Sequence, residues 1–337
     1  MKRLVGIGLA VLVLWTMDGG PWTDSPALAS CGAASCPIDT ASWERREPGS
    51  VSIGYQFEYI DQDEHRIGTR DAAFREIRGH HDEEFTLNRT HRFSAVIGIT
   101  DRWSVDLALP FVSRSHAHVH RHRGADILEA WDIKGVGDVS LVNRYAVWKP
   151  EPLSHPTVSV ILGGEFPTGR NHKVNDDGDE AEPGIQPGSN SWDLIVGLSS
   201  LQTFTVSMPS GRHGTLPLYA SVIGQLNGHG NDDYRLGDTL QVNVGAIYPA
   251  LPKLGFIGQI NLLLKDRDDQ GRTSEEIRKT GGEFLYLSPG LEFHPSESCR
   301  MYAVVQLPVY QRVNLIQTVS DYNLLFGVSH RFGARRK

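Results

Sequence analysis

Histidine is concentrated in the first half of this chain, and its imidazole binds Zn, Cu or Ni readily near neutral pH. Eight of the 14 histidines fall between residues 65 and 122. Those at 116, 118, 120 and 122 stand at every second position, which puts their imidazoles on one face of an extended chain. The sequence therefore predicts a transition-metal site, for Cu or Zn, drawn from His80, His81, His91, His116, His118, His120 and His122.

The same stretch has other interpretations. Arg114, Arg121 and Arg123 are interspersed among the histidines, so these side chains could instead be solvated or contact the phosphates of lipopolysaccharide. A pH-sensitive gate at the mouth of a channel is a further possibility, because histidine changes its charge near neutral pH. The sequence leaves these alternatives open.

Catalytic and calcium-binding patterns are weak. A hydrolase site could combine His91 with Ser94 or Asp106, but no Gly-x-Ser-x-Gly motif, glycine-rich phosphate loop or Cys-x-x-Cys pair is present. The acidic residues between 176 and 182, Glu182 included, lack the spacing of an EF-hand, so we expect a solvated loop there. We therefore expect no enzyme and no cofactor other than the Cu or Zn.

The elements that must position these residues are β-strands. Apolar residues recur at every second position, as in Trp103, Val105 and Leu107 against Ser104 and Asp106. No segment of comparable length shows a 3.6-residue stripe. The pattern predicts twelve strands, at residues 51–60, 87–99, 102–113, 138–148, 157–166, 191–204, 215–227, 236–248, 254–265, 283–293, 300–311 and 319–332.

Connections between the predicted strands alternate in length. Long polar loops cover residues 61–86, 114–137, 167–190 and 266–282, whereas links such as Thr100-Asp101 are short. This alternation is typical of bacterial transmembrane barrels. We therefore predict an all-β fold, a transmembrane antiparallel up-and-down β-barrel of about 12 strands with long external loops and short periplasmic turns. The two histidine-rich loops would then share the external side.

Such a barrel turns its apolar face to lipid and its polar face to the lumen. A soluble barrel or sandwich is the alternative, but the polar face is rich in Gly, Ser and Asn, which suits a narrow lumen. Aromatic residues near strand ends fit the lipid interfaces: Trp103, Trp148, Trp192, Tyr248, Phe293, Tyr310 and Phe332. The predicted lumen-lining charges, which could form a selectivity path or pair and fill the lumen, are Glu58, Asp106, Arg144, Glu165, Asp193, Lys265, Glu292 and Arg331.

The backbone chemistry of a membrane strand demands closure of the sheet. Lipid offers no partner to an unpaired N–H or C=O group, so the first and last strands must pair. Prolines inside the predicted strands each remove one ladder donor, and they predict bulges or local kinks: Pro110, Pro217, Pro289 and Pro308.

The N-terminus has the layout of a secretory signal. A basic start precedes an uncharged apolar run from Leu4 to Trp15, and Ala27-Leu28-Ala29 offers a small-x-small cleavage site. The predicted organisation is a signal peptide over residues 1–29, a periplasmic N-terminal segment over 30–49 and an outer-membrane β-barrel over 50–333.

The cysteines and the net charge limit the possible covalent links and partners. After export, Cys31 and Cys36 could form a disulfide, or Cys31 could carry lipid. A formal charge of -7 gives nucleic-acid binding no support. The expected partners are outer-membrane lipid and lipopolysaccharide, the barrel-assembly machinery, which reads an aromatic end such as Phe332, and a small-molecule solute.

Three short motifs carry a resemblance to a known family. Gly137-Asp138-Val139, Phe166-Pro167-Thr168-Gly169 and Gln186-Pro187-Gly188-Ser189, with Asp193 just after, resemble the MetA-pathway of phenol degradation family of outer-membrane transporters, over residues 50 to 332. The resemblance implies movement of small, often hydrophobic or aromatic compounds; the histidine-rich first half departs from it. The expected function is uptake or passage of small solutes. The alternatives are Cu or Zn binding or uptake at the cell surface and, less favoured, an outer-membrane hydrolase.

Overall fold

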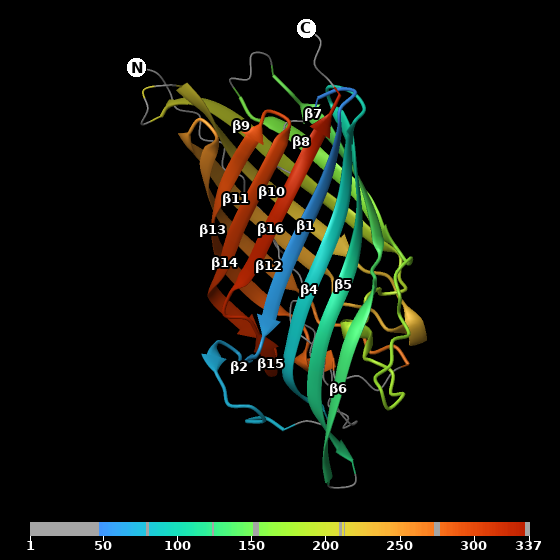
Figure 1. The fold of residues 1–337 in the computed structure, drawn as a ribbon. Coiled ribbons are helices and arrows are strands. Elements are labelled where there is room, and N and C mark those ends of the chain that lie inside the picture. Colours follow the sequence, from blue (N-terminus) through green and yellow to red (C-terminus); the bar gives the residue numbers. More distant parts are fainter. Residues whose placement is uncertain are drawn as a thin grey trace, which may run out of the picture.

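Twelve antiparallel strands form a closed barrel in the computed structural model (Figure 1), which describes residues 47–78, 81–122, 125–150, 155–208, 211, 213–272 and 277–333. The barrel strands are β1 (Val51–Gln62), β4 (His81–Gly98), β5 (Trp103–His122), β7 (Val139–Trp148), β8 (Thr157–Phe166), β9 (Asp193–Ser207), β10 (His213–Leu226), β11 (Thr239–Leu251), β12 (Leu254–Lys265), β13 (Gly282–Ser296), β14 (Cys299–Val313) and β16 (Asn323–Phe332). All twelve predicted segments are found, and the predicted fold class is confirmed.

Closure joins the first and last barrel strands. β1 pairs with β4 on one side and with β16 on the other, from Val51 opposite Phe332 to Ile60 opposite Asn323. Every barrel strand therefore has a hydrogen-bonded neighbour on both sides, as backbone groups facing lipid require. Among the described residues, no helix combines the length and apolar character needed to cross a bilayer.

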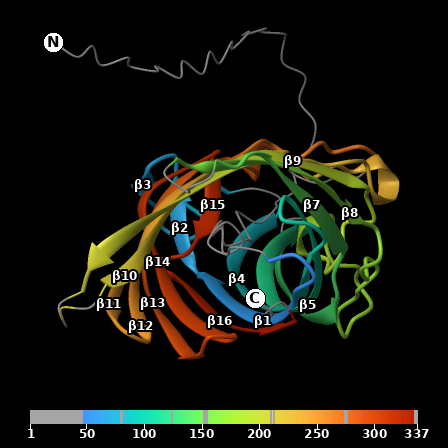
Figure 2. The ribbon, with the colours of Figure 1, turned by 90° about the horizontal axis from the view of Figure 1, so that it is seen from above.

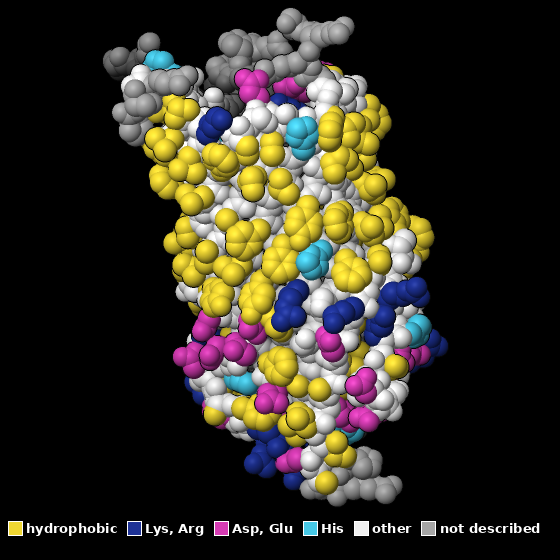
Figure 3. Space-filling model, in the orientation of Figure 1, with side chains coloured by type: hydrophobic (Ala, Val, Ile, Leu, Met, Phe, Trp, Pro, Cys, Tyr) yellow, Lys and Arg dark blue, Asp and Glu magenta, His cyan; other side chains and the backbone are white. Residues whose placement is uncertain are grey.

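The outside of the barrel is apolar. Leu162, Leu198 and Ile260 are each more than half exposed although they lie in the middle of strands, and Figure 3 shows hydrophobic side chains covering a broad band of the surface, with charged groups beyond one edge. All seven predicted interface aromatics are exposed, Trp192 by 70%. Such a surface is stable in lipid and costly in water. The fold is that of an outer-membrane barrel, with the apolar face outward as predicted.

The two ends of the barrel differ in the length of their loops. The connections between β4 and β5, β11 and β12, and β13 and β14 are short and lie at one end, whereas the long connections lie at the other (Figure 1).

Parts of the predicted long loops are strands. β5 continues to His122 and pairs with β6 (Ala125–Val136), so most of 114–137 is a hairpin that extends the barrel wall. Within 61–86 lie β2 (Glu64–Ile67) and β3 (Arg70–Asp71), and β15 (Ile316–Val319) pairs with β2 in a small second sheet. Seen along the barrel, β2 and β15 lie within its outline (Figure 2). The short lengths of β2, β3 and β15 and the polar residues around them hid these strands from a search for apolar alternation.

The prolines act less uniformly than predicted. Pro308 adjoins a shift of register, since Leu285 pairs with Tyr310 but Tyr286 pairs with Pro308. Pro110 lies where β5 changes its partner from β7 to β6, and the ladders on both sides of Pro289 keep their register. A bulge accompanies only the first of these three. The predicted signal peptide, Cys31 and Cys36 lie outside the described residues.

Candidate functional site

The histidine stripe lies on the inner face of the outer half of β5, where this strand pairs with β6. His116 and His118 are each 1% exposed, and His120 is half-buried on the same face, as the spacing predicts. His80 and the side chain of His122 lie outside the part of the chain that the structure describes.

A β-bulge in β4 brings a fourth histidine to this face. Glu83 lies opposite His118 but Phe85 lies opposite Ala117, so the residue between them, Glu84, is extra. One extra residue reverses the alternation of side chains. His81 consequently faces inward, where its ring stacks on that of His118 with centroids 4.4 Å apart.

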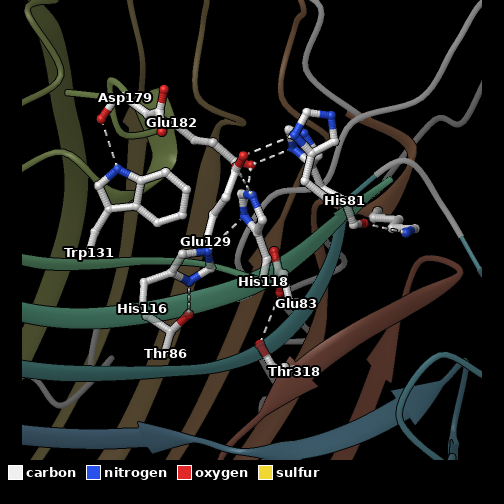
Figure 4. A network of polar contacts seen from close by, with 12 residues as sticks. His81, Glu83, Thr86, His116, His118, Glu129, Trp131, Asp179, Glu182 and Thr318 are labelled. Atoms are coloured by element: carbon white, nitrogen blue, oxygen red, sulfur yellow. Dashed lines mark hydrogen bonds and ion pairs between the residues drawn. The ribbon is translucent and has the colours of Figure 1, made fainter. Parts of the chain in front are cut away.

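The carboxylate of Glu182 lies between two of these imidazoles (Figure 4). Its Oε1 is 3.0 Å from His81 Nδ1 and 3.4 Å from His118 Nδ1. Glu182 is 6% exposed and comes from the loop between β8 and β9, just before the single turn η1 (Pro183–Ile185). The three ligand atoms lie within 4.8 Å of one another. Two imidazoles and one carboxylate are a donor set that zinc uses.

A second carboxylate, that of Glu129 in β6, contacts His118 and His120. Its Oε2 is 3.0 Å from His118 Nε2, and its Oε1 is 3.0 Å from His120 Nδ1. On the neighbouring strand, Thr86 Oγ1 lies 2.8 Å from His116 Nδ1. These contacts fix the orientation of the imidazole rings, as carboxylates and hydroxyls do around metal-binding histidines.

Two buried side chains position the loop that carries Glu182. Arg114 of β5 donates through Nη1 to the carbonyl oxygens of Gly184, at 3.2 Å, and Gln186, at 3.3 Å. The Gln186 side chain donates through Nε2 to the carbonyl oxygen of Ala181 at 2.7 Å. The backbone on both sides of η1 is therefore fixed against the barrel wall.

The motifs that carry the family resemblance meet at the base of this loop. Asp138 is 5% exposed, and its carboxylate accepts hydrogen bonds from Gly169 N at 2.8 Å, Ser189 N at 2.6 Å and Ser189 Oγ at 2.9 Å. A Cβ atom on Gly169 would lie 2.8 Å from Gly137 C and 2.8 Å from Gly188 Cα. We call these hydrogen bonds to Asp138, together with the close packing of Gly137, Gly169 and Gly188, the Asp138 anchor. The Asp138 anchor ties both ends of loop 167–192 to the start of β7.

Some sequence-predicted residues lie elsewhere. His91 is not part of the cluster, because it shares the outer face of β4 with the exposed Phe93 and its Nδ1 lies 2.8 Å from Tyr55 Oη. Ser94 and Asp106 line an inner cavity. The sheet therefore separates His91 from both, and the proposed hydrolase arrangement is not formed.

Glu182 and Glu129 were missed as members of the site. The acidic stretch was expected to be solvated, but the loop folds back onto β6, where Ile185 packs with Trp131 and Ile133 in an apolar cluster. An isoleucine, Ile185, in a mostly polar loop was the available signal.

Charged residues also link the loops at the external mouth. Arg75 donates to Asp82 at 2.9 Å and, through two nitrogens, to Asp126 at 2.7 and 2.9 Å. The hydrogen bonds that the Arg75 guanidinium donates to Asp126 raise its pKa above the usual range. Lys279 of η3 (Ile277–Lys279) reaches Asp82 from the opposite wall at 3.4 Å. The β1–β4 and β12–β13 connections are thus joined to the β5–β6 hairpin.

The predicted lumen-lining charges sit away from lipid. Glu58, Arg144, Asp193 and Glu292 are buried, and Glu292 Oε2 accepts from Arg300 Nε at 2.6 Å. The other four, Asp106, Glu165, Lys265 and Arg331, are half-buried.

Two adjoining cavities lie inside the barrel. They share Ser52, Arg300 and Ser329; Glu292 lines one of them and Asp106 the other. Groups of both charges therefore face this interior space.

Comparisons with known proteins address the fold. No protein-family model matches the chain, and no curated protein matches it. Among solved structures, the COG4313 outer membrane channel from Pseudomonas putida F1 is similar, with 13% identity, a TM-score of 0.61 and coverage of 88% of this chain and 100% of that one. The NanC porin (11% identity, TM-score 0.42, 82% and 98% covered) and a Pseudomonas aeruginosa FadL homologue (11%, 0.43, 84% and 90%) also match. The first likeness shows a shared outer-membrane barrel fold.

Proposed function

We propose that this chain passes small polar solutes across the outer membrane through the interior of its barrel. The observation that carries the proposal is the pair of adjoining cavities inside a closed barrel whose outer surface is apolar. Arg300, Arg331 and Glu292 border the same cavity, so a solute with charged or hydrogen-bonding groups would find partners of both signs. The fold shared with an outer membrane channel supports the proposal.

Single-channel conductance in planar bilayers tests this function with a pair of neighbouring substitutions. Ser52 lines both cavities, whereas Ile53, the next residue, is half exposed on the lipid side. We expect Ser52→Trp to reduce conductance at least severalfold because an indole would fill the shared space. Ile53→Trp should leave conductance unchanged. A protein that folds and inserts but shows no conductance, or two variants with equal conductance, would contradict the proposal.

The family relationship and the cargo are finer proposals. We infer kinship with the MetA-pathway of phenol degradation family, and the meeting of its three motifs at the Asp138 anchor supports this. Hydrophobic or aromatic cargo is implied by that resemblance alone. Liposome swelling with a small sugar and with an aromatic acid of similar size would separate the two cargo classes.

Lipopolysaccharide and the barrel-assembly machinery are proposed partners. The exposed ring of Phe332 at the end of β16 suits the machinery's aromatic signal. Outer-membrane lipid is the partner that the apolar exterior supports most directly.

A further inference from the structure

Carboxylate oxygens lie beside both ring nitrogens of His118. Its Nε2 faces Glu129 Oε2 at 3.0 Å, and its Nδ1 faces Glu182 Oε1 at 3.4 Å. A neutral imidazole has a single N–H and can donate to only one of these carboxylates. When Nε2 donates to Glu129, Nδ1 turns its lone pair toward the side where Glu182 Oε1 and His81 lie, and this nitrogen is then available as a metal ligand.

Two of the three spacings between ligand atoms fit a transition metal, and the third, between His81 Nδ1 and His118 Nδ1, is within 4.8 Å. A tetrahedral Zn²⁺ site with bonds of about 2.0–2.1 Å places its ligand atoms about 3.3 Å apart. Glu182 Oε1 lies 3.0 Å from His81 Nδ1 and 3.4 Å from His118 Nδ1. His116 Nε2 is 3.3 Å from His118 Nδ1, so a fourth ligand is close at hand. Larger Ca²⁺ prefers six to eight oxygen ligands, which this site does not offer.

The surroundings hold these ligands in place. Glu129 behind His118 forms the carboxylate–histidine pair that orients metal ligands and raises their basicity. The bulge at Glu84 turns His81 inward, and Arg114 fixes the backbone beside Glu182. The ligands come from β4, β5 and the β8–β9 loop, so an ion bound here would join a loop to the wall of the barrel (Figure 4).

We propose that His81, His118 and Glu182 bind one divalent transition-metal ion of the Zn²⁺ class, which fastens loop 167–192 against the external mouth and thereby lowers solute conductance. The effect on conductance rests on the proposed function; the binding does not. The metal has a regulatory role at the mouth in this proposal and is not the cargo.

Calorimetric titration of the purified, detergent-solubilised full chain with ZnCl₂ tests the binding. We expect one equivalent bound by the wild type, and an affinity loss of more than about 100-fold in both Glu182→Gln and His81→Ala, since removing a ligand should exceed the 10- to 100-fold effect of outer-shell partners. His172→Ala is the matched control, because His172 is exposed on the same loop. Heat-dependent gel mobility verifies that each variant is folded. Equal Zn²⁺ affinity in wild type and folded Glu182→Gln would overturn the site.

Conductance recorded with and without ZnCl₂ tests the consequence. We expect Zn²⁺ to lower the conductance of the wild type and of His172→Ala but to leave Glu182→Gln unaffected. Stoichiometric Zn²⁺ binding with unchanged conductance would overturn the role at the mouth. Stoichiometric binding in a chain that never conducts would instead contradict only the proposed channel, so the two failures are distinguishable.

Discussion

Replacing Asp138 by Asn should loosen the whole β8–β9 loop while leaving the barrel closed. The Oδ2 atom of Asp138 accepts two hydrogen bonds from Ser189, at 2.6 and 2.9 Å, and Oδ1 accepts one from Gly169. An Asn side chain keeps one acceptor and turns an NH₂ group toward the other set of donors. Each hydrogen bond to a charged group contributes about 1.5–3 kcal/mol, and their partial replacement leaves a net cost of about 2–4 kcal/mol.

Amide hydrogen exchange in detergent micelles measures this cost locally. A factor of ten corresponds to about 1.4 kcal/mol, so the amides of Gly169 and Ser189 should exchange about 30- to 700-fold faster. Amides in the middle of β12 should be unaffected. Asp132→Asn is the control, because that carboxylate is exposed and contacts Lys134. Wild-type exchange rates at Gly169 and Ser189 in the Asp138→Asn protein would refute the anchoring role.

Three further changes test other parts of the structure. Gly169→Ala places a Cβ 2.8 Å from backbone atoms that cannot move aside, so trypsin should cleave loop 167–192 at least tenfold faster than in wild type. Leu162→Arg puts a charge on the lipid face of β8 and should destabilise the barrel by about 2–4 kcal/mol in urea unfolding from vesicles, whereas a soluble barrel would tolerate it. Glu292→Gln removes the carboxylate that Arg300 contacts at 2.6 Å inside the cavity, so the reversal potential in a salt gradient should shift toward anion selectivity. An unchanged reversal potential would show that Glu292 and Arg300 do not line the path of the conducted ions.

The barrel could be predicted from the sequence because the alternation of apolar and polar residues that defines its strands repeats every two residues. Alternation in stretches such as Trp103 to Leu109 specifies a strand, and apolar side chains on one face demand a lipid or core partner. Twelve such segments with alternating loop lengths leave few other topologies. The interface aromatics followed from the same logic, since a ring such as that of Trp192 at a strand end suits the boundary between lipid and water.

The candidate site could be predicted only in part, because its geometry depends on contacts between distant segments. The spacing of His116, His118 and His120 at every second position was enough to predict that their side chains share one face of β5. The inward turn of His81 depends on the extra residue at Glu84, and no local pattern identifies which residue of a strand is extra. Glu182 was assigned to solvent because the docking of its loop depends on side chains 40 to 70 positions away, among them Arg114.

The division of β5 into two halves explains how one fold combines a membrane section with a histidine cluster beyond it. Its first half pairs with β7 and must present apolar residues to lipid at every second position, so substitutions there are constrained by the membrane. Beyond Pro110 the strand pairs with β6, and its inner face carries the buried His116 and His118. The ladder continues through both halves, so the rigidity that closure gives to the membrane section extends to the external cluster. A long loop alone could not hold two imidazoles and a carboxylate oxygen at 3.0 and 3.4 Å spacings. The extended barrel wall orders the two imidazoles, and the Asp138 anchor ties down the loop that brings the Glu182 carboxylate to them.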